Sequence, residues 1–276
     1  MPLPLASADK IASYAVSGPE PSPAAFAVEL SQAVHRINLI NAWDPAIVPG
    51  TRVLELGCGQ GTCTQALAEA VTSPEGPNGP GSGHITAVDP APLDYGAPFT
   101  LGQAQSHLSA GPLGPLVTFH RADPVEFLAS NANTWDVAVL AHCIWYFPSD
   151  DTLGKILSAL RGRVSRVCLA EWAMHATEPA ATAHVLATLA RATFEAHRVD
   201  STENIQTPAS PQTIKQIVGQ AGWKIGTERT VVPEPELSDG FWETGAVVDK
   251  GFAEDVEKEI KDGRVKAVLT GFNWGR

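Results

Sequence analysis

Three glycines alternate with other residues in a short stretch that leads from an apolar segment into a helix-like one. The stretch is VLELGCGQGTCTQALAEAV, residues 53–71, and the glycines are Gly57, Gly59 and Gly61. A glycine-rich turn between a strand and a helix lets a ligand approach the backbone and places it near the helix N-terminus. Open α/β sheets bind ligands at the carboxyl ends of their strands, so this turn predicts a site for a nucleotide-like ligand.

The spacing of these glycines distinguishes two kinds of nucleotide site. The dinucleotide fingerprint is G-x-G-x-x-G. This chain has G-x-G-x-G instead, with Thr62 where the last glycine of the fingerprint would stand and Glu55 before the first glycine. An NAD-dependent dehydrogenase therefore remains an alternative, but the glycine spacing disfavours it.

Strand and helix patterns alternate along the rest of the chain. We expect strands at 51–57, 84–89, 116–123, 134–145 and 165–172, and helices at 23–43, 62–71, 101–110, 124–130 and 151–162. Further helices are expected at 178–199, 211–222 and 239–263, with two last strands at 222–233 and 264–274. This alternation predicts a parallel sheet with helices on both faces, which the last two strands would complete.

Composition and charge limit the possible partners. The 276 residues include 30 acidic and 19 basic ones, giving a net charge of −11, which disfavours nucleic acid because its binding relies on Lys and Arg. The longest apolar run, 135–147, is too short to span a membrane, and the first ten residues do not resemble a signal peptide. Without a CxxC pair, the four cysteines are predicted to be reduced thiols in a cytoplasmic protein.

Four further segments support a family resemblance. VLELGCGQG resembles motif I of the class I S-adenosylmethionine-dependent methyltransferases, whose common form is an aliphatic strand followed by E/D-x-G-x-G-x-G. ITAVDPA, FHRADPVEF and WDVAVLAHCIWYF resemble the family's second-, third- and fourth-strand motifs, and AGWKIGTERTV is similar to the segment that leads into its antiparallel hairpin. The resemblance covers roughly residues 53–232, and the loop at 73–83 makes the gap between Gly61 and Asp89 longer than usual.

The resemblance implies a fold and a cofactor. The fold would be α/β, with a Rossmann-like, seven-stranded, mostly parallel sheet, helices on both faces, an antiparallel last strand and helical cap elements. Residues 1–45 would form an N-terminal arm and cap helix, and residues 46–276 the methyltransferase domain, with helical insertions near 174–210 and 236–263. The cofactor would be S-adenosyl-L-methionine, with S-adenosyl-L-homocysteine as the product.

The resemblance also implies the residues that hold this cofactor. Asp89 would bond the ribose hydroxyls and Asp123 would accept from the adenine amino group. The expected cofactor-binding residues are Glu55, Gly57, Cys58, Gly59, Gly61, Asp89, Pro90, Ala122, Asp123, Ala141 and His142. The sulfonium and amino-acid parts of this cofactor carry no phosphate, so the turn needs no lysine.

Candidate catalytic residues lie where the fourth and fifth strands are expected to end. His142 is a candidate general base, although it would equally suit packing near the cofactor. Glu171 would orient His142 or bind a substrate amine, unless it serves as a cap or in a buried pair. The expected substrate-binding residues are Tyr14, Trp145, Tyr146 and Trp172. No metal site is predicted, because the spacing of His175, His184 and His197 lacks an i, i+4 pair.

The predicted reaction is in-line methyl transfer to a small-molecule nucleophile with an O, N or S acceptor atom, in which proximity and orientation supply much of the catalysis. AHCI, in place of DPPY or NPPY after the fourth strand, disfavours methylation of base or glutamine amino groups. The main alternative is a methyltransferase-like protein that binds the cofactor without transferring methyl, in a regulatory or templating role. A homodimer is possible.

Overall fold

The computed structural model describes residues 2–18, 22–198, 201 and 203–271. The chain divides into two compact units. Unit 1 comprises Met1–Cys143, Lys155–Ala170 and Trp223–Leu237, and unit 2 comprises Ile144–Gly154, Glu171–Gly222 and Ser238–Arg276. Each unit contains its own cluster of buried apolar side chains.

Unit 1 is built on a parallel sheet. Its strands are β1 (Arg52–Leu56), β2 (His84–Asp89), β3 (Val117–Arg121), β4 (Trp135–Ala141) and β5 (Val164–Ala170). They lie in the order β3-β2-β1-β4-β5, and every pairing is parallel. The carboxyl ends of all five strands therefore share one edge of the sheet. The strand order reverses between β1 and β4, which is where sheets of this kind bind ligands.

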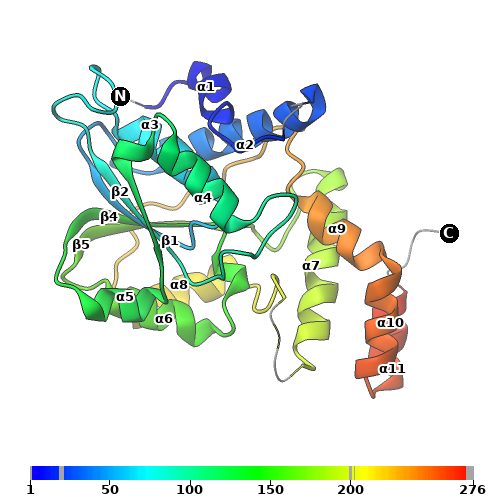
Figure 1. Ribbon diagram of the computed structural model, residues 1–276. Helices are drawn as coiled ribbons and strands as arrows, with labels where there is room; N and C mark the ends of the chain where they lie inside the picture. The colour runs from blue at the N-terminus through cyan, green and yellow to red at the C-terminus, as the bar shows by residue number, and fades with distance from the viewer. Residues whose placement is uncertain (1, 19–21, 199–200, 202, 272–276) are drawn as a thin grey trace. The chain divides into compact units, whose positions relative to one another are not determined.

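Helices cover both faces of this sheet. They are η1 (Leu5–Ser7), α1 (Ala8–Ala12), α2 (Pro23–Ala42), α3 (Thr62–Val71), α4 (Leu101–Ala110), η2 (Gly114–Leu116) and α5 (Pro124–Ser130), and α6 (Asp150–Ala159) ends in unit 1. Figure 1 shows α2, α3 and α4 on one face and α5 on the other. Side-chain caps fix where helices begin: Ser22 accepts from the Ala25 amide, and Thr100 forms a capping box with Gln103.

One cluster of buried side chains in unit 1 joins the sheet to helices α2 and α3. Val53 of β1, Ile85 of β2 and Val137 of β4 are fully buried in one cluster with Leu67 of α3 and Ile37 of α2. Burying each such side chain contributes about 1.5–3 kcal/mol. The glycine turn therefore extends from a rigid, well-packed strand.

Unit 2 is helical. Its elements are η3 (Ile144–Tyr146), the start of α6, η4 (Pro179–Ala181), α7 (Thr182–Glu195), α8 (Pro211–Gln220), α9 (Gly240–Val248), α10 (Lys250–Glu259) and α11 (Gly263–Thr270). Phe194 of α7, Val247 of α9, Val256 of α10 and Leu269 of α11 share its core. The helices expected at 178–199 and 211–222 are present, whereas the one expected at 239–263 is two helices that meet at Asp249.

The α/β fold with a parallel sheet is confirmed, but the prediction of seven strands is wrong. The described residues contain five strands and no antiparallel one. The expected strand at 264–274 is helix α11 as far as Thr270, and its residues 272–274 lie outside the described part of the chain. The side chain of Asp262 caps this helix by accepting from the amides of Arg264 and Val265. Val265, Val268 and Leu269 also follow a helical spacing, which the sequence analysis missed.

The absence of this strand also explains why the other expected strand, at 222–233, does not form. A strand expected at 222–233 needs a neighbour whose backbone groups it can bond. The segment has no regular secondary structure, and Ile225 and Val232 are exposed. Its second residue, Trp223, is anchored by its side chain, because the indole donates to the Leu157 carbonyl oxygen at 2.9 Å and lies under the Arg161 guanidinium.

The sequence predicted no membrane span, and it predicted reduced cysteines. Among the residues that the structure describes, no helix is long and apolar enough to cross a membrane. Cys58, Cys63, Cys143 and Cys168 are all buried free thiols.

Candidate cofactor site

The glycine turn follows β1 directly and leads into α3. Gly57, Gly59 and Gly61 have φ angles of 74°, 53° and 93°, in the left-handed region that other residues rarely adopt. A Cβ at Gly57 would lie 2.5 Å from the Cβ of Cys143, and one at Gly61 would lie 2.5 Å from Leu108 Cδ1. A Cβ at Gly59 would meet nothing within 4 Å. Two of the glycines are thus needed for packing, whereas Gly59 borders open space.

Asp89, at the end of β2, holds this turn in place. Its Oδ2 accepts from the Gly59 amide at 2.8 Å, and its Oδ1 accepts from the Ala91 amide at 2.9 Å. Gln105 of α4 donates to the Gly59 carbonyl oxygen at 2.8 Å. The Asp89 carboxylate is only partly buried, and each of its oxygens has a second lone pair that can accept from a ligand hydroxyl. The structure therefore brings together Asp89 and Gly59, two of the predicted cofactor-binding residues.

The end of β3 reaches the same edge of the sheet. The Ala122 amide donates to the Asp89 carbonyl oxygen at 3.1 Å. Asp123 caps α5, because its Oδ1 accepts from the amides of Val125 at 2.8 Å and Glu126 at 3.0 Å. The Asp123 carboxylate is exposed, and both of these bonds use one of its oxygens, so capping and ligand binding are compatible. Pro90, next to Asp89, is exposed as well.

Glu55 lies beneath the turn, where it is 2% exposed. Its carboxylate accepts from the Thr64 hydroxyl of α3 at 2.5 Å. Burial raises the pKa of Glu55 to about 7, although hydrogen bonds from Thr64 and Cys63 and the charge of Arg36 oppose the shift. These contacts tie β1 to α3. A direct contact of Glu55 with the cofactor stays a prediction.

Two further predicted cofactor residues are Cys58, within the turn, and Ala141, at the end of β4. Cys58 is buried within the turn, and burial raises the pKa of its thiol well above the usual range. It is therefore a neutral, unreactive group. Ala141 ends β4 and pairs with Ala170 of β5.

His142 follows β4 in a strained conformation. Among the described residues, His142 is the only non-glycine residue with a positive φ, at 54°. Its amide donates to the Ala170 carbonyl oxygen at 2.9 Å. Strain of this kind is often found at functional sites. The His142 Nε2 lies 2.9 Å from the Nε2 of His35, and the two rings stack with centroids 5.1 Å apart.

His35 comes from α2 and was not singled out in the sequence. It is 2% exposed, and burial, with the nearby Arg36 and His142, lowers its pKa to about 2. A neutral imidazole has one N–H and one lone pair, so His35 can fix which nitrogen of His142 carries the proton. The signal in the sequence was the pair His35-Arg36 between the apolar residues Val34 and Ile37.

Glu171 and the predicted substrate-binding tryptophans belong to unit 2. The Glu171 Oε2 accepts from the Ile144 amide at 2.8 Å and from the Trp145 amide at 3.4 Å, and its Oε1 accepts from its neighbour Trp172 at 2.9 Å. Glu171 thereby caps η3 and holds the two tryptophans by their backbones. Its predicted roles, orienting His142 or binding a substrate amine, stay predictions. Tyr146, on η3, is 45% exposed.

Tyr14 lies against α3 in unit 1. Its hydroxyl donates to Glu69 Oε2 at 3.4 Å, and the Lys10 ammonium lies 2.7 Å from Oε1 of the same carboxylate. Glu69 is seven residues after the start of α3, so it lies about 10 Å along the helix axis from the glycine turn. This contact explains Tyr14 without a ligand, and its substrate role stays a prediction.

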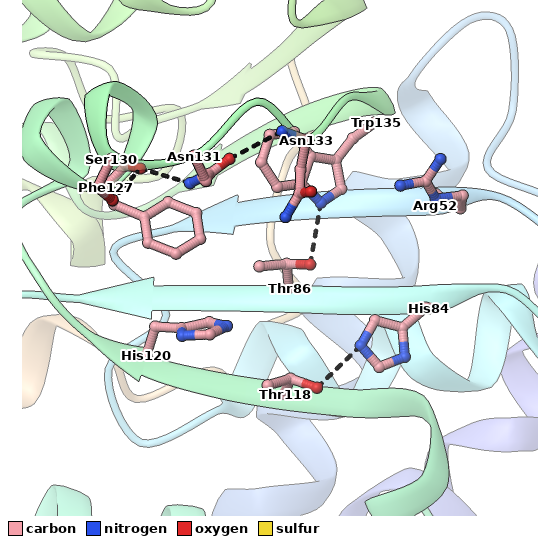
Figure 2. A pocket seen from close by; sticks show the side chains of 10 residues that line it. All are labelled: Arg52, His84, Thr86, Thr118, His120, Phe127, Ser130, Asn131, Asn133 and Trp135. Carbon is pink, nitrogen blue, oxygen red and sulfur yellow. Dashed lines mark hydrogen bonds between the residues drawn. The ribbon is translucent and has the colours of Figure 1, made fainter.

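A hollow of about 440 Å³ lies nearer the amino ends of the strands (Figure 2). It is lined by Arg52, His84, Thr86, Thr118, His120, Phe127, Ser130, Asn131, Asn133 and Trp135. Its polar groups largely bond one another: the Trp135 indole donates to Thr86 at 2.9 Å, and His84 Nε2 lies 3.0 Å from the Thr118 hydroxyl. Because ligands of such sheets bind at the carboxyl ends, the glycine turn is the better candidate site.

Comparison with known proteins identifies the family. No profile of a protein family matches the chain. A cyclopropane-fatty-acyl-phospholipid synthase-like protein from Lactobacillus casei ATCC 334 is 34% identical and aligns over 97% of this chain and 93% of its own, with a TM-score of 0.80. The methyltransferases phomM and phomM′ of Diaporthe leptostromiformis are each 30% identical in an alignment of 242 positions that covers 75% of this chain. The chain belongs to the class I S-adenosylmethionine-dependent methyltransferases.

Membership of this methyltransferase family confirms the resemblance inferred from the glycine turn and the strand ends. The chain spans 62% of the length of each Diaporthe relative.

Sequence reasoning did not assign a role to His35, His184 or Glu243. The latter two lie on helices α7 and α9 of unit 2, whose pairing no motif predicts.

Proposed function

We propose that this chain transfers the methyl group of S-adenosylmethionine to a small-molecule nucleophile by in-line displacement. The observation that carries the proposal is the Gly59–Asp89 contact of 2.8 Å at the reversal point of the sheet. The turn offers open space beside Gly59, and a partly exposed carboxylate borders it. These features fit a nucleoside without phosphates.

The residues present suit each part of this cofactor. Asp89 would accept hydrogen bonds from the ribose hydroxyls, and Asp123 would accept from the adenine amino group through the oxygen that does not cap α5. The backbone of Gly57, Gly59 and Gly61 would border the methionine part, with open space beside Gly59. Ala141 and His142 would line the side of the site that faces β4.

The reaction itself requires few groups from the chain. When bound, the cofactor supplies a methyl group on a positively charged sulfur. The chain's residues would hold the acceptor atom in line with that methyl group, at a separation of about 3–3.5 Å. His142, oriented by His35, would accept the proton that an O, N or S acceptor releases. For this role His35 would accept the hydrogen bond from His142 Nε2–H, which leaves the lone pair on His142 Nδ1 to take the proton.

The acceptor is proposed to be a small molecule. The excess of acidic over basic residues disfavours a phosphate backbone. Trp172, which Glu171 holds by its backbone amide, is partly exposed and offers a flat apolar surface of the kind that binds small ligands. A cytoplasmic location and a homodimer remain predictions.

A turnover assay tests the proposal. The protein is incubated with S-adenosylmethionine and a panel of small alcohols, phenols, amines and thiols, and release of S-adenosylhomocysteine is measured. We expect release that depends on one class of acceptor and is lost in Asp89→Ala. Tight cofactor binding without release on any acceptor would favour the rival, a protein that binds the cofactor without transferring methyl.

A further inference from the structure

The hollow near the amino ends of the strands lies entirely within unit 1. Side chains of β1, β2, β3, β4 and α5 and of the loop after α5 line it (Figure 2). Its volume of about 440 Å³ falls within the range of about 300–1,000 Å³ that small-molecule sites occupy. Arg52, which lines it, stands five residues before Gly57, or about 16 Å along an extended strand. The hollow is therefore separate from the glycine turn.

Hydrogen bonds hold the lining of this hollow in shape. Arg163 donates to the Asn133 carbonyl oxygen and to Asn131 Oδ1, each at 2.7 Å. Its guanidinium also lies 5.6 Å from the centroid of the Trp135 ring. On the other side of that ring system, the Trp135 indole donates to the Thr86 hydroxyl at 2.9 Å. The hollow is thus largely preformed, which lowers the cost of binding a ligand.

Three neighbouring rings give the hollow an apolar wall. The centroid of His120 lies 4.9 Å from that of Phe127, and the centroid of Phe127 lies 6.2 Å from that of Trp135. His120 and Phe127 are partly exposed, whereas Trp135 is buried. An accessible aromatic wall of this kind packs well against a flat ligand ring.

The polar groups that stay available in the hollow can donate hydrogen bonds. The Arg52 guanidinium forms no hydrogen bond or ion pair in the described part of the chain, because Asp136 bonds only the Arg52 backbone amide, at 2.7 Å. The contact of His84 Nε2 with the Thr118 hydroxyl leaves Nδ1 of His84 unbonded among the described residues. The His120 ring also forms no hydrogen bond with them. Arginine nitrogens only donate, and histidine nitrogens can donate.

The charges around the hollow favour an anion. None of the described residues that line it is acidic, although the chain has 30 acidic and 19 basic residues. Arg52 and His84 are register partners on β1 and β2, so their side chains leave the same face of the sheet side by side. Burial lowers the pKa of His84, and Arg52 and His120 add to the shift. A bound anion would offset the repulsion among these groups.

We propose that the hollow binds a flat aromatic carboxylate, at a site distinct from that of the cofactor. The carboxylate accepts hydrogen bonds from the Arg52 guanidinium and from His84 Nδ1–H, and the ring lies against Phe127. The planar fork of an arginine matches the two oxygens of a carboxylate. The aromatic wall favours a ligand with a ring over a bare phosphate. This inference goes beyond methyl transfer and does not depend on it.

The test uses 2-naphthoate and its uncharged analogue 2-naphthamide, which has the same ring and nearly the same shape. Their dissociation constants for the full chain are measured by ligand-observed NMR. The variants are Arg52→Gln and His84→Asn, and circular dichroism checks that they fold. Their matched controls are Arg229→Gln and His107→Asn, the same changes at exposed positions of unit 1 outside the hollow.

We expect the wild-type protein to bind 2-naphthoate about tenfold more tightly than 2-naphthamide, because the amide carries no charge to pair with Arg52. Arg52→Gln and His84→Asn should each lower this preference to about threefold or less, and the controls should keep it. If one variant does not fold, the wild-type preference and the other variant decide the outcome. Absence of naphthoate binding, equal binding of the two probes, or an unchanged preference in either folded variant would overturn the site.

Two competition measurements locate the probe and test its chemical class. Saturating S-adenosylhomocysteine should leave the naphthoate affinity unchanged, and displacement would put the probe at the glycine turn and overturn the site. Inorganic phosphate at the same concentration as naphthoate should not displace it, and displacement would contradict the role of the aromatic wall. A wild-type protein that keeps its naphthoate preference but binds no S-adenosylhomocysteine would refute the proposed function and support this site.

Discussion

Replacing Gly59 by alanine separates the cost of backbone strain from the loss of ligand space. At φ 53° an alanine is strained, but its Cβ meets nothing within 4 Å in the protein itself. Strain of this kind costs about 1–2 kcal/mol. Gly162 is the matched control, because it has a φ of 72°, meets nothing within 4 Å, and precedes β5 at the amino edge of the sheet. The two variants should therefore lose similar free energies of unfolding.

The two variants should differ in cofactor affinity. In Gly59→Ala the new methyl group occupies the space proposed for the ligand, and an overlap of about 2 kcal/mol weakens binding about 30-fold. Gly162→Ala should bind S-adenosylhomocysteine as the wild type does. Urea unfolding gives the stabilities, and calorimetry gives the dissociation constants. If Gly59→Ala binds within about twofold of Gly162→Ala, with equal stability, the reasoning about the turn is refuted.

Three other substitutions test individual contacts. The pKa of Glu55 is 4.5 in the unfolded chain and about 7 in the folded one, so the unfolded state binds fewer protons between these pH values and the free energy of unfolding should fall by up to about 3 kcal/mol as pH rises through them. Urea unfolding at both ends of this pH window should show that Glu55→Gln removes the fall, and an unchanged dependence of stability on pH would contradict the burial of the carboxyl. Backbone strain and the clash with Cys143 should lower the free energy of unfolding of Gly57→Ala by about 2–5 kcal/mol, measured by urea unfolding. A decrease below about 1 kcal/mol would contradict that contact. His35→Phe should lower kcat about tenfold or more and leave the affinity for S-adenosylhomocysteine unchanged, because His142 loses its hydrogen-bond partner. An unaltered kcat would exclude a positioning role for His35.

Local signals in the sequence were sufficient for the first five strands and the cofactor turn. The glycine spacing and the acidic residue that ends β2 both predict contacts in one neighbourhood, and the structure has Gly59 bonded to Asp89. The two residues meet because the carboxyl ends of parallel strands share one edge of the sheet. Pro124 likewise indicated where α5 begins.

The parts that failed depend on contacts between distant segments. Val265 and Val268 suggested a strand by their type, while the cap at Asp262 and packing against α10 decided for a helix. His35 and His142 are 107 residues apart, and His184 lies beside Glu243 because Gly240 lets α7 and α9 approach. No local periodicity carries that information.

Calorimetric titration of S-adenosylhomocysteine into the wild-type protein and the Asp89→Ala variant tests the central claim most directly. We expect one binding site per chain in the wild type and an affinity at least about tenfold weaker in Asp89→Ala, because hydrogen bonds to a charged group are lost. No measurable binding by the folded wild-type protein, or equal binding by both proteins, would contradict it.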